Sequence, residues 1–358
     1  SALGLALIVF GVLMSSTWGW VQPRSALTIA GVEITPLGFS AVPFLILAGL
    51  GLLWAFASWT ERRARRGLDT LLDLALLKVV TLRAGLSTLF MTQFVLLGTF
   101  FVMPVYLQIV LGLNALETGV RIIPMSVAML VAALAGPRLA AGRSVKRVCQ
   151  AGFVALAVGA GIVIGSMNVE LDTLEFSIGL AIFGAGAGLL ASQLGNVIMS
   201  SVGPSRTNEA GGLQGTAQNL GASFGTALIG AILLAGLTHG FVDRVQTNPD
   251  IPPDVAQQIV TSASSKGLEM VSVAQAEQIA TEAGMSAADA AAVAQDYGQA
   301  QLESLQNALG TVTFFAILAL WFTRKLPMRP GAPGSAAADA PVLVEGADEG
   351  SVEERGAA

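Results

Sequence analysis

Two glutamines stand in an apolar stretch at residues 211–236, where their amides could hydrogen-bond a small molecule. Counted at 100° per residue, Gln214 and Gln218 fall on one helix face together with glycines, and large apolar residues fall opposite. Glycines four residues apart also let two helices approach closely. Two interpretations stay open, helix packing alone or the lining of a cavity. The glycines of this face are Gly211, Gly215, Gly221 and Gly225.

A second polar face is predicted at residues 177–199. Gln193 and Asn196 share one side of the helix, and a run of glycines precedes them. Amides inside an apolar segment must face protein or water, which favours a cavity wall. The glycine run favours close helix packing, and we predict it at Gly184 and Gly188.

A third face lies on residues 85–108, where Thr92, Thr99 and Met103 recur at helical spacing and Gln93 stands beside them. Methionines at this spacing are more often packing than ligand sites. With that alternative open, we predict that these four residues line the same cavity.

Arg121 is the one cation placed about a turn inside an apolar segment, shortly before Pro124. A long basic side chain there can snorkel to the membrane interface. The other interpretation is an ion pair with a substrate or a gate, so Arg121 joins the predicted cavity residues.

Groups that carry proton, metal or covalent chemistry are scarce. No Asp or Glu falls in the middle of an apolar segment, and the chain holds a single cysteine, Cys149, and a single histidine, His239. A membrane enzyme needs nucleophiles, metal ligands or acid pairs, so we predict no enzyme, no metal site and no cofactor. His239 is interpreted as an incidental interfacial residue, with pH sensing as the alternative.

Composition defines the elements that must position these residues. The 358 residues are 53% hydrophobic and 12% charged, whereas a soluble chain carries roughly 25% charged residues. This excludes a soluble enzyme and a nucleic-acid-binding protein. The apolar segments are roughly 17 to 25 residues long, which is enough to cross a bilayer. Such segments must be helices in lipid, so the predicted fold is an all-α transmembrane bundle. The spans are predicted at 2–17, 38–58, 85–108, 119–138, 148–167, 177–199, 211–236 and 307–323.

The charges are distributed unevenly over the connections. If the first connection is outside, fourteen Lys and Arg fall inside and four outside. The positive-inside rule then predicts a cytoplasmic C-terminus and a cytoplasmic basic loop at 59–84 in a cell-membrane protein.

The outer segment 237–304 differs from its surroundings, with nine acids against two bases and a net charge of −7. We expect two or three short amphipathic helices there, as a solvated spacer or as a lid. The tail 324–358 is rich in Pro, Gly, Ala and Glu and is predicted to be disordered.

Three motifs together resemble one family. They are VYLQIVLGLNALETGVRIIPM from Val105, GAGAGLL from Gly184 and NEAGGLQGTAQNLGASFGTALIG from Asn208, and WTERRARRG from Trp59 precedes them. In this order they resemble the C-terminal part of the fourteen-helix drug:proton antiporters of the major facilitator superfamily. The resemblance covers roughly residues 1–325.

The resemblance implies an arrangement of domains. Residues 1–58 would be a two-helix hairpin, and 85–323 would be a six-helix domain of two inverted triplets. It also implies that helices on 85–108, 119–138, 177–199 and 211–236 line a central cavity. Some members carry an acid where this chain has Gln214 and Gln218.

The predicted function is proton-driven efflux of drugs or small lipophiles by alternating access, with this chain as the C-terminal portion. A metabolite uniporter or symporter and a non-transporting fragment are the alternatives. Expected partners are the lipid bilayer, a small lipophilic or cationic substrate and an N-terminal six-helix half. No nucleic acid is expected, and the complete protein is expected to be a monomer.

Overall fold

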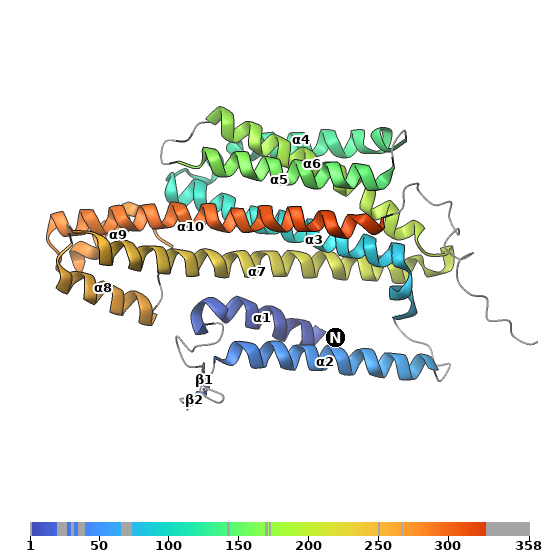
Figure 1. Cartoon of the computed structure of the whole chain (residues 1–358), viewed down its shortest axis with the longest axis horizontal. Helices are drawn as coiled ribbons and strands as arrows, with labels where there is room; N and C mark the ends of the chain where they lie inside the picture. The colour runs from blue at the N-terminus through green and yellow to red at the C-terminus, as the bar shows by residue number, and fades with distance from the viewer. Residues whose placement is uncertain are drawn as a thin grey trace, which may run out of the picture.

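The computed structural model describes residues 2–19, 27–29, 32–34, 40–65, 74–141, 144–168, 171, 173–249, 251–266, 268 and 270–326. Long helices running side by side dominate it (Figure 1). The predicted all-α bundle is confirmed, because apolar segments of this length satisfy their backbone polar groups only as helices in lipid.

The long helices are α1 (Ala2–Trp18), α2 (Ala41–Arg65), α3 (Val80–Pro104), α4 (Ala115–Ala141), α5 (Val145–Ser166), α6 (Thr173–Ser200), α7 (Thr207–Thr247) and α10 (Ala287–Phe322). The short helices are α8 (Pro253–Lys266) and α9 (Val273–Glu282), with 3₁₀ turns at Leu74–Lys78, Pro204–Arg206 and Thr323–Lys325 and a π-helical segment at Val105–Val110. A small antiparallel hairpin of β1 (Leu27–Ile29) and β2 (Val32–Ile34) follows α1.

Seven of the eight predicted spans coincide with helices that, within the described residues, are long and apolar enough to cross a membrane. At the predicted span 2–17, α1 is a shorter apolar helix of 17 residues. The bounds of the segment predicted at 237–304 are corrected, because α7 continues to Thr247 and α10 already begins at Ala287.

The core of the bundle consists of two three-helix repeats. α3 packs on α7 and α10, while α6 packs on α4 and α5. The first repeat is α3, α4 and α5, and the second is α6, α7 and α10. The contact of α3 with α7 then corresponds to that of α6 with α4, and the contact of α3 with α10 to that of α6 with α5, as inverted repeats require. In Figure 1, α4, α5 and α6 form the upper layer, α3, α7 and α10 the middle layer, and α1 with α2 lie below α7.

Glycines bring α6 and α4 into backbone contact. A Cβ on Gly184 would overlap the carbonyl oxygen of Met125, and a Cβ on Gly188 would overlap that of Met129. Both the glycines and the carbonyls are four residues apart, so the two backbones touch over a full turn. We call this contact the α4–α6 seam.

A matching contact joins α7 to α3. A Cβ on Gly221 would overlap the carbonyl oxygen of Phe90, and a Cβ on Gly225 would overlap that of Phe94. We call this contact the α3–α7 seam. Each seam joins helices from different repeats, so the two seams hold the repeats together.

The packing prediction for Gly211 and Gly215 is corrected. Beside the Cβ position of Gly211 only the Met199 Cε lies within 4 Å, at 3.7 Å, and beside that of Gly215 there is open space. Both glycines share a face with Gly221, but no described atom of α3 lies within 4 Å of their Cβ positions, so helical periodicity alone placed them in the seam.

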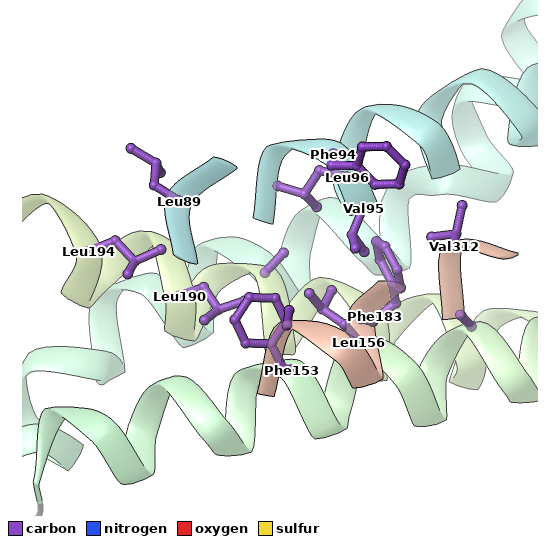
Figure 2. Packing of buried hydrophobic residues seen from close by; sticks show 14 of the residues in the cluster. Leu89, Phe94, Val95, Leu96, Phe153, Leu156, Phe183, Leu190, Leu194 and Val312 are labelled. Carbon is purple, nitrogen blue, oxygen red and sulfur yellow. The ribbon is translucent and has the colours of Figure 1, made fainter. Parts of the chain in front are cut away.

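The apolar core fills the space between the two repeats. Figure 2 shows side chains of α3, α5, α6 and α10 gathered in one cluster. Val95, Phe153, Leu156 and Val312 are completely buried there, and Phe183 is 1% exposed. α6 also meets α5 through glycines, since a Cβ on Gly186 would lie 2.5 Å from the carbonyl oxygen of Gly152.

The segment for which short helices were predicted has a small core of its own. α8 and α9 pack with the ends of α7 and α10 around Phe241, Val245 and Tyr297. The Asn248 amide donates to the buried Asp296 carboxylate at 2.7 Å, which ties α7 to α10. Ser286 caps the start of α10, since its hydroxyl accepts from the Asp289 backbone N–H. The rest of the predicted tail, from residue 327, lies outside the described residues.

Substituting alanine at glycines of α6 tests the seams. We expect Gly184→Ala to destabilise the protein by about 1–3 kcal/mol or more, because the new methyl overlaps backbone atoms that cannot rotate away. The measurement is the midpoint of thermal unfolding in detergent. Gly195→Ala is the matched control on the same helix, with open space around its Cβ position. An equal loss for both variants would contradict the seam.

Candidate functional site

The structure places Thr92, Thr99 and Met103 of α3 in the core. They are 3%, 2% and 1% exposed, and the two hydroxyls donate to carbonyls of their own helix, Thr88 and Val95. The prediction that these side chains line an open cavity is therefore corrected. The physical reason is that α6, α7 and α10 all pack around α3.

Three of the predicted amides lie along the α3–α7 seam. Gln93 is half-buried and its Cβ lies 3.1 Å from the Cβ position of Gly221. Gln218 precedes Gly221 by one turn of α7, and Gln214 precedes it by two. Among the described residues, the buried Oε1 of Gln214 has no hydrogen-bond partner. A shielded acceptor without a donor costs about 1–3 kcal/mol, so a ligand that donates a hydrogen bond would relieve this cost.

Gln193 and Asn196 lie on α6 and do not share an environment. Gln193 is 5% exposed and donates to the Ser192 hydroxyl at 3.0 Å. Its amide nitrogen is 3.7 Å from the Cβ position of Gly136 on α4, which places it in the α4–α6 seam. Asn196 is exposed. The predicted common face of these two amides is thus split between a helix interface and an open surface.

Arg121 lies at the far end of the α4–α6 seam from Gln193. Its guanidinium donates to the hydroxyl of Thr173, the first residue of α6. Gly136, beside Gln193, follows Arg121 by 15 residues of α4, a rise of about 22 Å. Arg121 therefore joins the N-terminal ends of α4 and α6 and lies apart from Gln193.

The π-helical segment after α3 and the middle of α10 hold the two residues that follow α5. The Tyr106 hydroxyl donates to the Asn168 carbonyl at 2.8 Å, and the Gln306 amide donates to the Met167 carbonyl at 3.0 Å. Tyr106 belongs to the π-helical segment that follows Pro104. Such segments often mark functional positions in helices.

The sequence analysis missed a polar stripe on α7, formed by Thr216, Asn219 and Ser223. These residues line an open groove between α7 and α1. The signal was available in the sequence, because the three residues recur at intervals of three and four in an apolar segment. We call them the polar stripe of α7.

Two inverted three-helix repeats in a helical membrane bundle, with amides beside the inter-repeat contacts, define the architecture of a secondary transporter. The model of the Major Facilitator Superfamily matches residues 2–226. The chain belongs to this superfamily.

Several curated proteins are similar to the chain. The tetracenomycin C resistance and export protein of Streptomyces glaucescens is 29% identical over 262 residues, which cover 72% of this chain and 44% of the relative. The probable actinorhodin transporter of Streptomyces coelicolor is 26% identical, covering 64% and 43%. The drug efflux pump JefA of Mycobacterium tuberculosis is 32% identical, covering 62% and 42%. The chain thus spans less than half the length of these relatives.

Cysteine labelling tests this placement of the polar residues. We expect Gln218→Cys and Asn196→Cys to react quickly with a water-soluble maleimide, because both positions are at least partly exposed. Thr92→Cys and Thr99→Cys should stay unlabelled, since these positions lie in the core. The variants are labelled in membranes, and the labelled fraction of each peptide is measured by mass spectrometry. Fast labelling at the threonine positions would show that they line an open cavity.

Proposed function

We propose that this chain is part of a permease that exports drugs or other small lipophilic compounds by alternating access. The observation that carries the proposal is the amide cluster of Gln93, Gln214 and Gln218 beside the α3–α7 seam in a member of the Major Facilitator Superfamily. The printed names of the relatives, which describe export, resistance and drug efflux, support it.

The cluster suits substrates of varied structure. Amides donate and accept hydrogen bonds without carrying charge. Gln214 follows the first residue of α7 by seven positions, about 10 Å. Substrate would therefore bind nearer to the end of the bundle where α7 begins, which the charge distribution assigns to the cytoplasm.

Alternating access needs a second bundle that rocks against this one. We propose an N-terminal six-helix half as that partner, with the complete protein acting as a monomer in the cell membrane and its C-terminus in the cytoplasm. The relatives' greater length supports this proposal.

We propose the proton gradient as the energy source. The apolar segments of this chain carry no carboxylate at their centres, and intramembrane proton relays are usually built from Asp, Glu or His. The proton carrier would then belong to the N-terminal half. The same lack of carboxylates also fits a uniporter, which needs no proton carrier.

Replacing both amides of α7 tests the substrate site. In the complete protein, Gln214→Leu with Gln218→Leu should weaken substrate affinity about tenfold or more, since each lost hydrogen bond contributes about 1 kcal/mol. The measurement is concentration-dependent dye export, with membrane insertion checked by immunoblot. Gln150→Leu on α5 is the matched control. Export at the wild-type level by the double variant would exclude these two amides as substrate-binding groups.

Dissipating the proton gradient separates the antiporter from the uniporter. With a protonophore, we expect accumulation of ethidium against its gradient in inside-out vesicles to fall to the level of vesicles without the protein. The reason is that export against a gradient needs a coupled ion. Accumulation that persists under these conditions would exclude proton coupling.

A further inference from the structure

A groove of about 620 Å³ lies between α1 and α7. Figure 1 shows α1 alongside α7, with α2, the other helix of the two-helix hairpin, on the far side of α1. Sites for small molecules usually measure about 300–1,000 Å³. The groove therefore has the capacity for a ligand of drug size.

The α1 wall of the groove is apolar and is not used for packing within the hairpin. Leu5, Ala6 and Val9 line the groove and recur at helical spacing. The face that packs on α2 is a different one, where a Cβ on Gly4 would lie 2.9 Å from the carbonyl oxygen of Gly49. α1 thus holds the hairpin together with one face and presents small and branched side chains to α7 with another.

The α7 wall carries the hydrogen-bonding groups. It consists of the polar stripe together with Gly212 and Gly215, beside whose Cβ positions there is open space. Thr216 already donates to the Gly212 carbonyl at 2.9 Å. Asn219, which is exposed, can offer both a donor and an acceptor to a ligand. The glycines create the space and the stripe supplies the polar contacts.

The lining selects ligands by charge. None of the residues that line the groove is ionisable. A cation placed there would lose hydration without gaining a counter-charge, which is costly in a membrane. An uncharged lipophile with a hydrogen-bonding group would bury apolar area against α1 and bond to the polar stripe.

We propose that the groove between α1 and α7 is a binding site for uncharged lipophilic molecules that carry a hydrogen-bonding group. In this proposal α1 of the two-helix hairpin forms one wall of the site. The site is separate from the amide cluster at the α3–α7 seam. The proposal deepens the proposed export function and rests on it for its role in transport.

Protection from alkylation tests the site directly. The complete protein in inside-out vesicles carries Ala6→Cys or Ser223→Cys and reacts with N-ethylmaleimide, with the labelled peptide read by mass spectrometry. N-phenyl-1-naphthylamine is the uncharged probe and ethidium the cationic one. Leu3→Cys is the matched control, because Leu3 is on the same turn of α1 and 66% exposed but does not line the groove.

We expect N-phenyl-1-naphthylamine at ten times its half-protecting concentration to slow both groove cysteines about tenfold by occupancy. Leu3→Cys should be unaffected, and ethidium should protect none of the three. Equal protection of Leu3→Cys, or no protection at either groove position, would overturn the site.

Export by the same vesicles separates this proposal from the proposed function. Vesicles that export ethidium without protection at the groove would retain the function and exclude the site. Protection in vesicles that export neither probe would establish the site and contradict the function. Ala6→Trp, which fills the groove, should slow export of N-phenyl-1-naphthylamine more than export of ethidium.

Discussion

The bundle depends on backbone contact at two glycine seams. Lipid gives no hydrophobic drive for helices to associate, so packing and close approach must hold them together. Gly184 and Gly188 lie over carbonyls of α4, and Gly221 and Gly225 lie over carbonyls of α3. Because each seam joins one repeat to the other, the seams also fix the neighbours of the polar side chains. Gln93 lies beside Gly221, one turn of α7 from Gln218, because Gly221 lets α7 approach α3.

Buried polar residues differ in whether their own helix can satisfy the hydrogen bonds of their side chains. A threonine hydroxyl can bond to a carbonyl of its own helix, so Thr92 and Thr99 fit inside the core. A glutamine amide has more donors and acceptors than its own helix can satisfy. Gln193 uses a neighbouring serine, whereas the buried oxygen of Gln214 has no partner among the described residues. Among the polar residues predicted for the cavity, Gln214 therefore offers the acceptor that a donating ligand would satisfy.

The sequence predicted the helices well, because the length of an apolar segment dictates a helix in lipid. Periodicity also gave the face of α7, yet it could not show where along that face α3 makes contact, so Gly211 and Gly215 were assigned with Gly221 and Gly225. It gave a face of α3 without showing that other helices cover it. The end of α7 was predicted at 236 because the segment 237–304 carries an excess of acidic residues. The structure continues the helix because Phe241 and Val245 have a core of their own.

The most direct test is a cross-link between Gln93→Cys and Gln218→Cys in the complete protein. We expect a short methanethiosulfonate cross-linker to join them quickly and a transported substrate to slow the reaction, because both positions flank Gly221 on the proposed substrate face. Absence of the cross-link would contradict the α3–α7 placement. A cross-link that no substrate slows would contradict the assignment of this face to substrate.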